Sequence, residues 1–123
     1  AMQLIGVKYR YGGTSPETGL DCSGYVQYAF KNAVGVSLPR TASEQAHVGD
    51  VVGTSDMLPG DMVFFNTRGF SNSHVGIYVG NGMFVHSPNS RSQVRFDTLD
   101  SGYWKAHFTS ARRISKGNAP QAM

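Results

Sequence analysis

A single cysteine, Cys22, stands in the hexapeptide DCSGYV at residues 21–26, where a helix is predicted to begin. Asp21 can cap that helix. Cys22 then falls in its first turn, where unpaired backbone N–H groups and the helix dipole favour a thiolate. Apolar residues recur at steps of three and four from Cys22 to Ala33, which predicts one apolar helix face. A lone thiol closes no internal disulfide, so Cys22 is either a buried hydrophobe or a reactive group. Its place at a helix start favours a nucleophile.

Two histidines, His74 and His86, flank a predicted hairpin with strands at residues 74–79 and 83–87. A two-residue Asn-Gly loop would place the two histidines on opposite faces of the sheet. A three-residue loop at 80–82 instead pairs Gly76 with His86, which places His74 and His86 on the same face. Alternation favours the second register, because residues 75, 77, 79, 83 and 85 then form one apolar stripe. We therefore expect the histidines to be diagonal neighbours on a face that the cysteine helix can meet. Gly76 is expected to leave open space beside His86.

A cysteine, a histidine and a third polar group are the minimum set for thiol acyl transfer. In this interpretation His74 takes the proton of the Cys22 thiol and later acts as an acid, while His86 holds the His74 ring in the useful tautomer. The backbone N–H of Cys22 would stabilise the oxyanion. The alternative is a zinc site built from the same three side chains, but no pair shows the short spacing typical of metal ligands. No cofactor is expected.

The elements that must position these residues come in two groups. Gly35 is a plausible stop for the cysteine helix, and Thr41 is predicted to cap a short second helix, with Glu44 three residues later in the position of a capping box. Strands are predicted at residues 62–66, 74–79, 83–87, 93–97 and 107–113. Helices first and antiparallel strands after them indicate an α+β fold.

Composition narrows the class of protein. At 123 residues we expect one domain over residues 1–116 and a flexible tail over 117–123. The net charge is +3, and the basic residues are scattered apart from a small group at 112, 113 and 116, which does not favour a nucleic-acid partner. A weak attraction to an anionic polymer such as a bacterial wall is compatible with this charge. The sequence contains no run of eighteen apolar residues, so no membrane span is predicted. We expect a monomer.

Six segments together resemble the NlpC-type cell-wall endopeptidases, which are papain-like cysteine peptidases. They appear in the family's order and extend the resemblance from about residue 5 to 114. The segments are YRYGG (9–13), DCSGYV (21–26), LPRT (38–41), PGDMVFF (59–65), HVGIYVG (74–80) and FVH (84–86).

The resemblance implies a fold, a catalytic set and an activity. The fold would be papain-like, with N-terminal helices packed on an antiparallel sheet of about five strands. The catalytic set would be a triad of Cys22, His74 and His86. The usual activity of the family is hydrolysis of the bond between γ-D-glutamate and a diamino acid such as meso-diaminopimelate in peptidoglycan stem peptides. Such a substrate implies a location in the periplasm, the cell envelope or outside the cell.

The resemblance also suggests residues that bind substrate. Tyr9 matches a tyrosine beside the nucleophile that helps to position substrate, and Asp21 and Ser23 match residues placed around the free amine of the substrate. Thr41 is a further candidate contact. Three of these have a simpler interpretation: Tyr9 as a core aromatic, and Asp21 and Thr41 as helix caps. An amidase or acyltransferase of the same fold and a non-catalytic wall-binding module remain alternatives to the peptidase.

Overall fold

The helix that carries the cysteine forms where the sequence predicts it. The structure, a computed structural model, describes residues 13–15, 19–67, 69, 71–87 and 93–114. Helix α1 spans Cys22–Val34, with Asp21 as its N-cap and Gly35 as its C-cap. Gly35 has a φ of 70°, a left-handed conformation that glycine adopts without strain. Tyr9 and the tail at 117–123 lie outside the described residues.

A second, shorter helix follows and its capping box is confirmed. Helix α2 spans Ala42–Gln45. The Thr41 hydroxyl accepts a hydrogen bond from the Glu44 N–H, and the Glu44 carboxylate accepts one from the Thr41 N–H. Both bonds satisfy backbone donors that a helix start would otherwise leave unpaired. Thr41 is therefore a helix cap, as the simpler interpretation of its position expected.

The main sheet has six antiparallel strands in the order β3-β8-β4-β5-β6-β7. All five predicted strands are present, and β3 was missed because it is only three residues long and mostly exposed. A separate two-stranded ladder and a 3-10 turn complete these elements. The bounds are β1 Thr14–Ser15, β2 Gly19–Leu20, β3 Asp50–Val52, η2 Thr54–Asp56, β4 Met62–Phe65, β5 His74–Gly80, β6 Met83–His86, β7 Arg95–Thr98 and β8 Phe108–Arg113.

The hairpin of β5 and β6 has the predicted register. Ile77 pairs with Val85 and Tyr78 with Phe84, which continues to Gly76 opposite His86. The turn itself consists of Asn81 and Gly82, with φ of 54° and 74°, and the extra residue is absorbed by a bulge between Tyr78 and Gly80. This two-residue turn with a bulge differs from the expected three-residue loop, but it leaves the side chains of both strands on the expected faces of the sheet.

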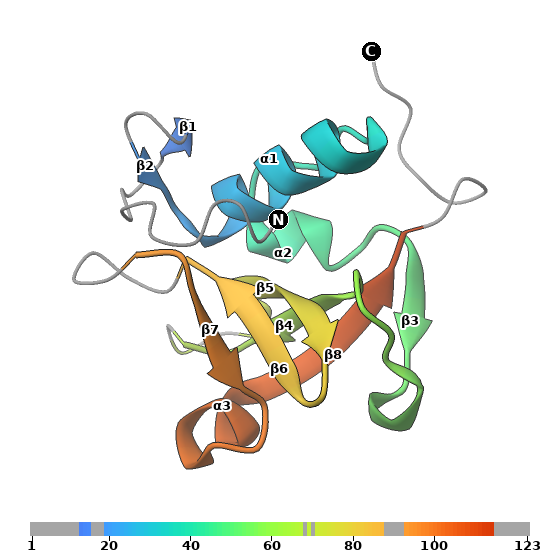
Figure 1. The fold of residues 1–123 in the computed structure, drawn as a ribbon, viewed down its shortest axis with the longest axis vertical. Helices are drawn as coiled ribbons and strands as arrows, with labels where there is room; N and C mark the ends of the chain where they lie inside the picture. The colour runs from blue at the N-terminus through green and yellow to red at the C-terminus, as the bar shows by residue number, and fades with distance from the viewer. Residues whose placement is uncertain (1–12, 16–18, 68, 70, 88–92, 115–123) are drawn as a thin grey trace.

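Two apolar layers lie on opposite faces of the sheet. Figure 1 shows α1 and α2 on one side and α3 (Gly102–His107) on the other. Helix α3 is not predicted by the sequence pattern, which places its last residue, His107, in the final strand. Under α1 and α2 the buried sheet residues include Met62, Phe64, Val75, Ile77 and Val85. Under α3 they are Val52, Val63, Phe65, Phe84 and Ala111, together with Trp104 of α3 itself.

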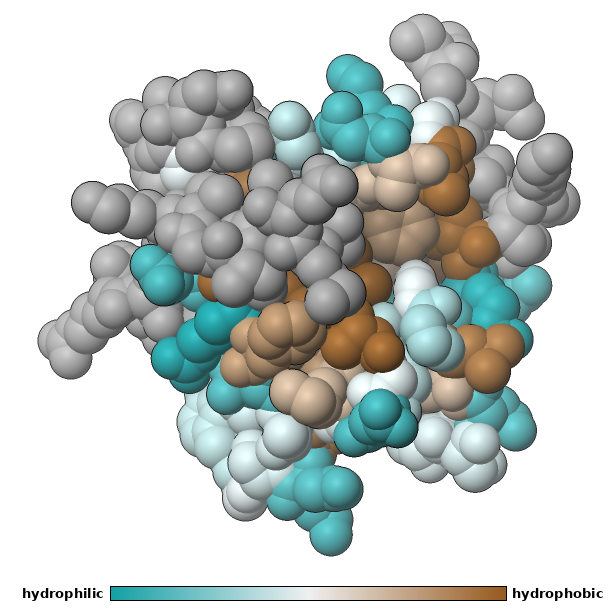
Figure 2. Space-filling view, in the orientation of Figure 1, coloured by the Kyte–Doolittle hydropathy of each residue, from teal (hydrophilic) through white to brown (hydrophobic). Residues whose placement is uncertain are grey.

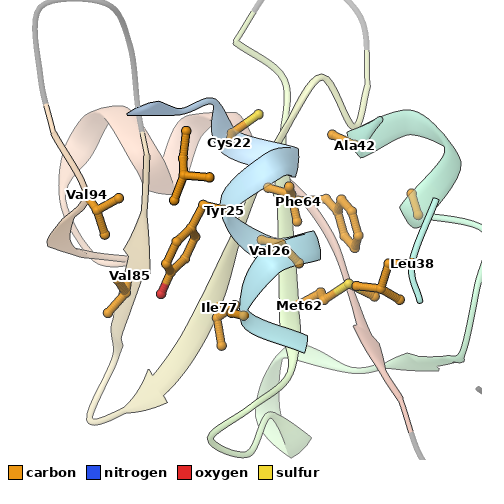
Figure 3. Packing of buried hydrophobic residues seen from close by; sticks show 14 residues of the cluster. Cys22, Tyr25, Val26, Leu38, Ala42, Met62, Phe64, Ile77, Val85 and Val94 are labelled. Carbon is orange, nitrogen blue, oxygen red and sulfur yellow. The ribbon is translucent and has the colours of Figure 1, made fainter. Parts of the chain in front are cut away.

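The first of these layers is the one that holds the cysteine helix. Tyr25 and Val26 of α1 point toward the sheet residues, and Cys22 stands at the end of the same helix (Figure 3). On the face shown in Figure 2, hydrophobic residues gather at the level where the helices meet the sheet, and hydrophilic residues lie around them. The packing of α1 therefore fixes the height at which its first turn stands above the sheet.

Candidate active site

Cys22 is the first residue of α1 and is 8% exposed. The Asp21 carboxylate caps the helix by accepting a hydrogen bond of 2.7 Å from the Gly24 N–H. Gly24 is required by packing, because a Cβ there would lie 2.2 Å from the carbonyl oxygen of Gly13. The predicted setting of the thiol, at the positive end of a capped helix, is confirmed.

Arg40 binds the same helix start from the loop before α2. Its guanidinium contacts both carboxylate oxygens of Asp21, at 3.1 and 2.9 Å, and also donates to the Ser23 hydroxyl at 2.9 Å and the Gly13 carbonyl at 3.3 Å. Two parallel bonds to one carboxylate fix its orientation. Asp21 and Ser23, which were predicted to bind substrate, thus have structural partners in this state. Arg40 belongs to the LPRT segment, but the sequence pattern does not predict this role for it.

The two histidines contact each other directly. His74 begins β5 and His86 ends β6, and the distance from His74 Nε2 to His86 Nδ1 is 2.7 Å. Their side chains are buried, with residue exposures of 3% and 0%. The prediction that they are neighbours on one face is confirmed. The expected open space beside His86 is wrong, because a Cβ on Gly76 would lie 3.0 Å from His86 Cβ.

His86 also contacts a carboxylate, Asp97, that the sequence pattern does not predict as part of the site. His86 Nε2 lies 2.6 Å from Asp97 Oδ2, and Arg95 Nε donates to the same oxygen at 3.0 Å. Asp97 pairs with Phe84 across the β6–β7 ladder, so it is a diagonal neighbour of His86 on one face. The sequence predicts a strand at 93–97. It does not predict the register of this strand against β6, because the connection between the two strands is too long for a turn type to fix that register.

Charge and burial act against each other in this pair. Burial lowers the pKa of His86 below its ordinary value of 6.5, although the hydrogen bond to Asp97 opposes that change. Burial on its own would raise the pKa of Asp97, but hydrogen bonds from His86 and Arg95 outweigh it, and that pKa lies below its ordinary value of 3.8. Asp97 is therefore a carboxylate near neutral pH.

Aromatic side chains enclose the histidines on the α3 side of the sheet. The ring of Trp104 stacks on His74 with centroids 5.5 Å apart, and meets His86 edge-on at 4.7 Å. Trp104 thus packs against the sheet and contacts both histidines, which the sequence pattern does not predict. The expectation that the cysteine helix meets the histidine face needs correction, because α1 packs on the opposite face, over Val75 and Ile77.

Cys22 and the histidines are instead connected around the end of the sheet. The Ser87 hydroxyl, directly after His86, donates to the carbonyl of Leu20, two residues before Cys22. The Gln45 amide donates to the Ser23 carbonyl, and the Ser43 hydroxyl to that of Asn72, two residues before His74. Bonds from β6 and from α2 thus hold the segments on which the thiol and both imidazoles are mounted.

The remaining predictions about ligands can be compared with the described ranges. Within residues 13–15, 19–67, 69, 71–87 and 93–114, no group of three or more His, Cys, Asp or Glu side chains is arranged to hold a metal ion. Among the helices described there, none is long and apolar enough to cross a membrane. His107 has a structural contact, with its Nδ1 bonded to the Asn66 carbonyl.

Known proteins are similar to this chain in sequence. A murein DD-endopeptidase, MepH, of Escherichia coli is 47% identical over 116 residues, which cover 92% of this chain and 43% of that protein. A gamma-DL-glutamyl hydrolase of Bacillus subtilis is 43% identical over 122 residues, 98% of this chain and 29% of that protein. The chain therefore spans less than half the length of these two relatives.

The structural comparison agrees with the sequence comparison. The crystal structure of an NlpC/P60 family protein from Bacillus cereus superposes with a TM-score of 0.84 at 31% identity, covering 91% of this chain and 37% of that one. The α+β, papain-like fold expected from the resemblance is the fold of these domains. The model of the NlpC/P60 family matches residues 6–113. This chain belongs to the NlpC/P60 family.

Proposed function

We propose that this chain is a cysteine peptidase that hydrolyses an amide bond in the peptide stems of bacterial peptidoglycan. The observation that carries the proposal is the 2.7 Å contact between His74 and His86, at the end of the sheet where Ser87 is bonded to Leu20, two residues before Cys22. A thiol at a helix N-terminus together with a histidine pair is a set for nucleophilic acyl transfer. The name of the Escherichia coli relative, a murein DD-endopeptidase, supports this class of substrate.

The proposed reaction has two halves. The Cys22 thiol gives its proton to His74, and its sulfur attacks the carbonyl carbon of the scissile amide. The negative charge on the carbonyl oxygen is stabilised by the N–H of Cys22 at the helix start. His74 then protonates the leaving amine, the C–N bond breaks, and a thioester remains on Cys22.

Water completes the cycle. His74 takes a proton from the water, whose oxygen attacks the thioester carbonyl. The C–S bond then breaks, His74 returns the proton to the sulfur, and a carboxylic acid and the free thiol are released. His86 keeps the His74 ring in the orientation that both halves need. Tyr9, Asp21, Ser23 and Thr41 remain proposed contacts of the substrate, with Asp21 and Ser23 placed beside the nucleophile by Arg40. We infer from the substrate that the protein works in the periplasm, the cell envelope or outside the cell.

The bond that we propose is the one between γ-D-glutamate and meso-diaminopimelate. The name of the Bacillus subtilis relative, a gamma-DL-glutamyl hydrolase, supports cleavage at a γ-glutamyl bond. A DD bond in the cross-link is the second candidate, favoured by the name of the Escherichia coli relative at 47% identity. An amidase or acyltransferase reaction would use the same nucleophile.

Purified muropeptides can separate these reactions. The protein is incubated with an uncross-linked disaccharide tripeptide that ends in meso-diaminopimelate, and separately with a cross-linked dimer, and the products are identified by mass spectrometry. Release of free diaminopimelate from the monomer supports the proposed bond, whereas conversion of the dimer to intact monomers supports the DD bond. The control is the Cys22→Ala variant, after circular dichroism has shown that it is folded. Activity that persists in this variant would refute the thiol mechanism.

A further inference from the structure

Resting on the proposed function, we propose that Asp97 is a positioning residue that fixes the tautomers of both histidines and so leaves the Nδ1 nitrogen of His74 able to accept a proton. The juxtaposition behind it is a continuous row of side chains on one sheet face. His74 Nε2 contacts His86 Nδ1 at 2.7 Å, and His86 Nε2 contacts Asp97 at 2.6 Å. Both nitrogens of the His86 ring are thus engaged.

The direction of the hydrogen bonds follows from the carboxylate. An ionised carboxylate accepts hydrogen bonds and donates none, so His86 Nε2 must carry the proton between His86 and Asp97. A neutral imidazole has one donor and one acceptor, and His86 Nδ1 is then the acceptor. Consequently His74 Nε2 must donate to it. The remaining nitrogen of His74, Nδ1, holds no proton in the neutral ring and can serve as the base.

The groups around His86 favour this charge distribution. From β7, Asp97 contributes a negative charge and Arg95 a positive one, with Arg95 Nε 3.0 Å from the Asp97 oxygen. From β5 the neighbour is His74, and from α3 it is the uncharged ring of Trp104. Arg95 keeps the carboxylate ionised, and burial of His86 keeps that ring neutral. Because His86 is neutral and accepts a hydrogen bond from His74 at Nδ1 while it donates to Asp97 at Nε2, the Asp97 carboxylate also fixes the tautomer of His74.

Loss of the Asp97 carboxylate removes the preference of His86 for the tautomer protonated at Nε2. An asparagine at position 97 offers both an oxygen and an NH₂ group, so His86 Nε2 can become an acceptor. His86 would then carry its proton on Nδ1 and donate it to His74 Nε2. The neutral His74 ring would hold its proton on Nδ1, the nitrogen that should receive the thiol proton. The fraction of molecules in this tautomer cannot activate Cys22.

The test compares Asp97→Asn with the wild type in three measurements. Ring ¹⁵N NMR should show the neutral His74 and His86 protonated at Nε2 in the wild type, and a population of His74 protonated at Nδ1 in the variant. Alkylation of Cys22 by iodoacetamide should need a higher pH in the variant. Muropeptide hydrolysis should lose roughly 10²-fold or more in kcat with KM unchanged, the scale of general-base catalysis.

Asp100→Asn is the matched control, because Asp100 is an exposed carboxylate just after β7. It should leave the tautomers, the alkylation profile and kcat as in the wild type. An unchanged His74 tautomer in Asp97→Asn overturns the proposal, whether or not activity falls, and so does a kcat within about twofold of the wild type. Asp97→Ala, which keeps no acceptor at all, should reproduce the tautomer change.

The measurements also separate this inference from the proposed function. The NMR and alkylation readouts need no substrate, so they test the role of Asp97 even if the chain does not cut peptidoglycan. Hydrolysis that survives Cys22→Ala would remove the proposed function. Altered tautomers in Asp97→Asn would still establish the role of the carboxylate. Full activity of Asp97→Asn alongside an inactive Cys22→Ala would remove only the inference.

Discussion

The hydroxyl of Ser87 donates a buried hydrogen bond to the backbone carbonyl of Leu20, across 67 positions of sequence. This bond joins the residue after His86 to the strand that leads into Cys22. Both partners are fully buried. The two halves of the candidate site come from opposite faces of the sheet, so a fixed connection around its end sets their relative position.

Ser87→Ala should therefore reduce both stability and activity. The substitution leaves the buried carbonyl of Leu20 without its donor, and a buried unsatisfied polar group costs about 1–3 kcal/mol. Urea unfolding gives the change in free energy, and muropeptide hydrolysis gives kcat. Ser101→Ala is the control, because the Ser101 hydroxyl also bonds a carbonyl, that of Thr98, but at an exposed site. Equal effects of the two substitutions would contradict this interpretation.

Substitution of the two histidines should have unequal effects. His74→Ala removes the proposed base, and we expect a loss of roughly 10²–10⁴-fold in kcat. His86→Ala should cost less, because water can partly replace a group that only orients its neighbour. The exposed His47, substituted by alanine, is the control and should retain full activity. Equal losses at positions 74 and 86 would argue against the assigned roles.

Arg40→Lys should loosen the start of α1. A lysine cannot form the paired bonds to both oxygens of Asp21, and because the Arg40 side chain is 35% exposed we expect a loss of only about 1 kcal/mol. Displacement of the Asp21 cap should also lower kcat/KM several-fold, because the helix turn that it caps carries the nucleophile Cys22. Arg113→Lys breaks a similar two-bond pair with Asp61 away from the site. That variant should show reduced stability with normal kcat/KM, and a matching drop in both variants would show that the Arg40 effect is not local.

Local signals in the sequence predicted the parts of the site that depend on near neighbours. The cap at Asp21 and the register between Gly76 and His86 follow from a few adjacent residues and their turn chemistry. The role of Asp97 depends on the register of β6 against β7, and residues 87–94 are too many for a turn type to fix that register.

Contacts at long range could not be read from periodicity. Arg40 reaches Asp21 across 19 positions, and nothing in the spacing of the chain encodes that bond. Helix α3 was missed because its single buried residue, Trp104, gives no amphipathic pattern over six residues. Its burial against His74 becomes visible only when the sheet is assembled.

The stability of the fold should depend on pH through His86. Because burial lowers the pKa of His86 below 6.5, the unfolded chain binds a proton at this residue that the folded chain does not. The free energy of unfolding is therefore expected to fall as the pH decreases from 6.5 through the lower pKa of the folded state. Urea unfolding at several pH values should show a shallower dependence for His86→Gln. The exposed His47→Gln should follow the wild type, and an identical slope in all three proteins would exclude His86 as the source.

Gly76→Ala should disturb the histidine pair without touching either ring. A Cβ at this position would lie 2.9 Å from Phe84 Cδ2 and from the Val85 carbonyl oxygen, and 3.0 Å from His86 Cβ. Because the carbonyl belongs to the sheet ladder, the strands must shift, and we expect a loss of about 1–3 kcal/mol. The shift moves His86 away from His74, so kcat should fall as well.

Gly102→Ala provides the opposite case for the same substitution. Gly102 begins α3, and a Cβ there meets nothing within 4 Å. Alanine restricts the unfolded chain more than glycine does, so this variant should gain about 0.4–1 kcal/mol in unfolding free energy with unchanged kcat. Thermal unfolding and hydrolysis assays on both variants measure the contrast. If Gly76→Ala behaves like Gly102→Ala, the close packing at Gly76 does not hold His86 in place.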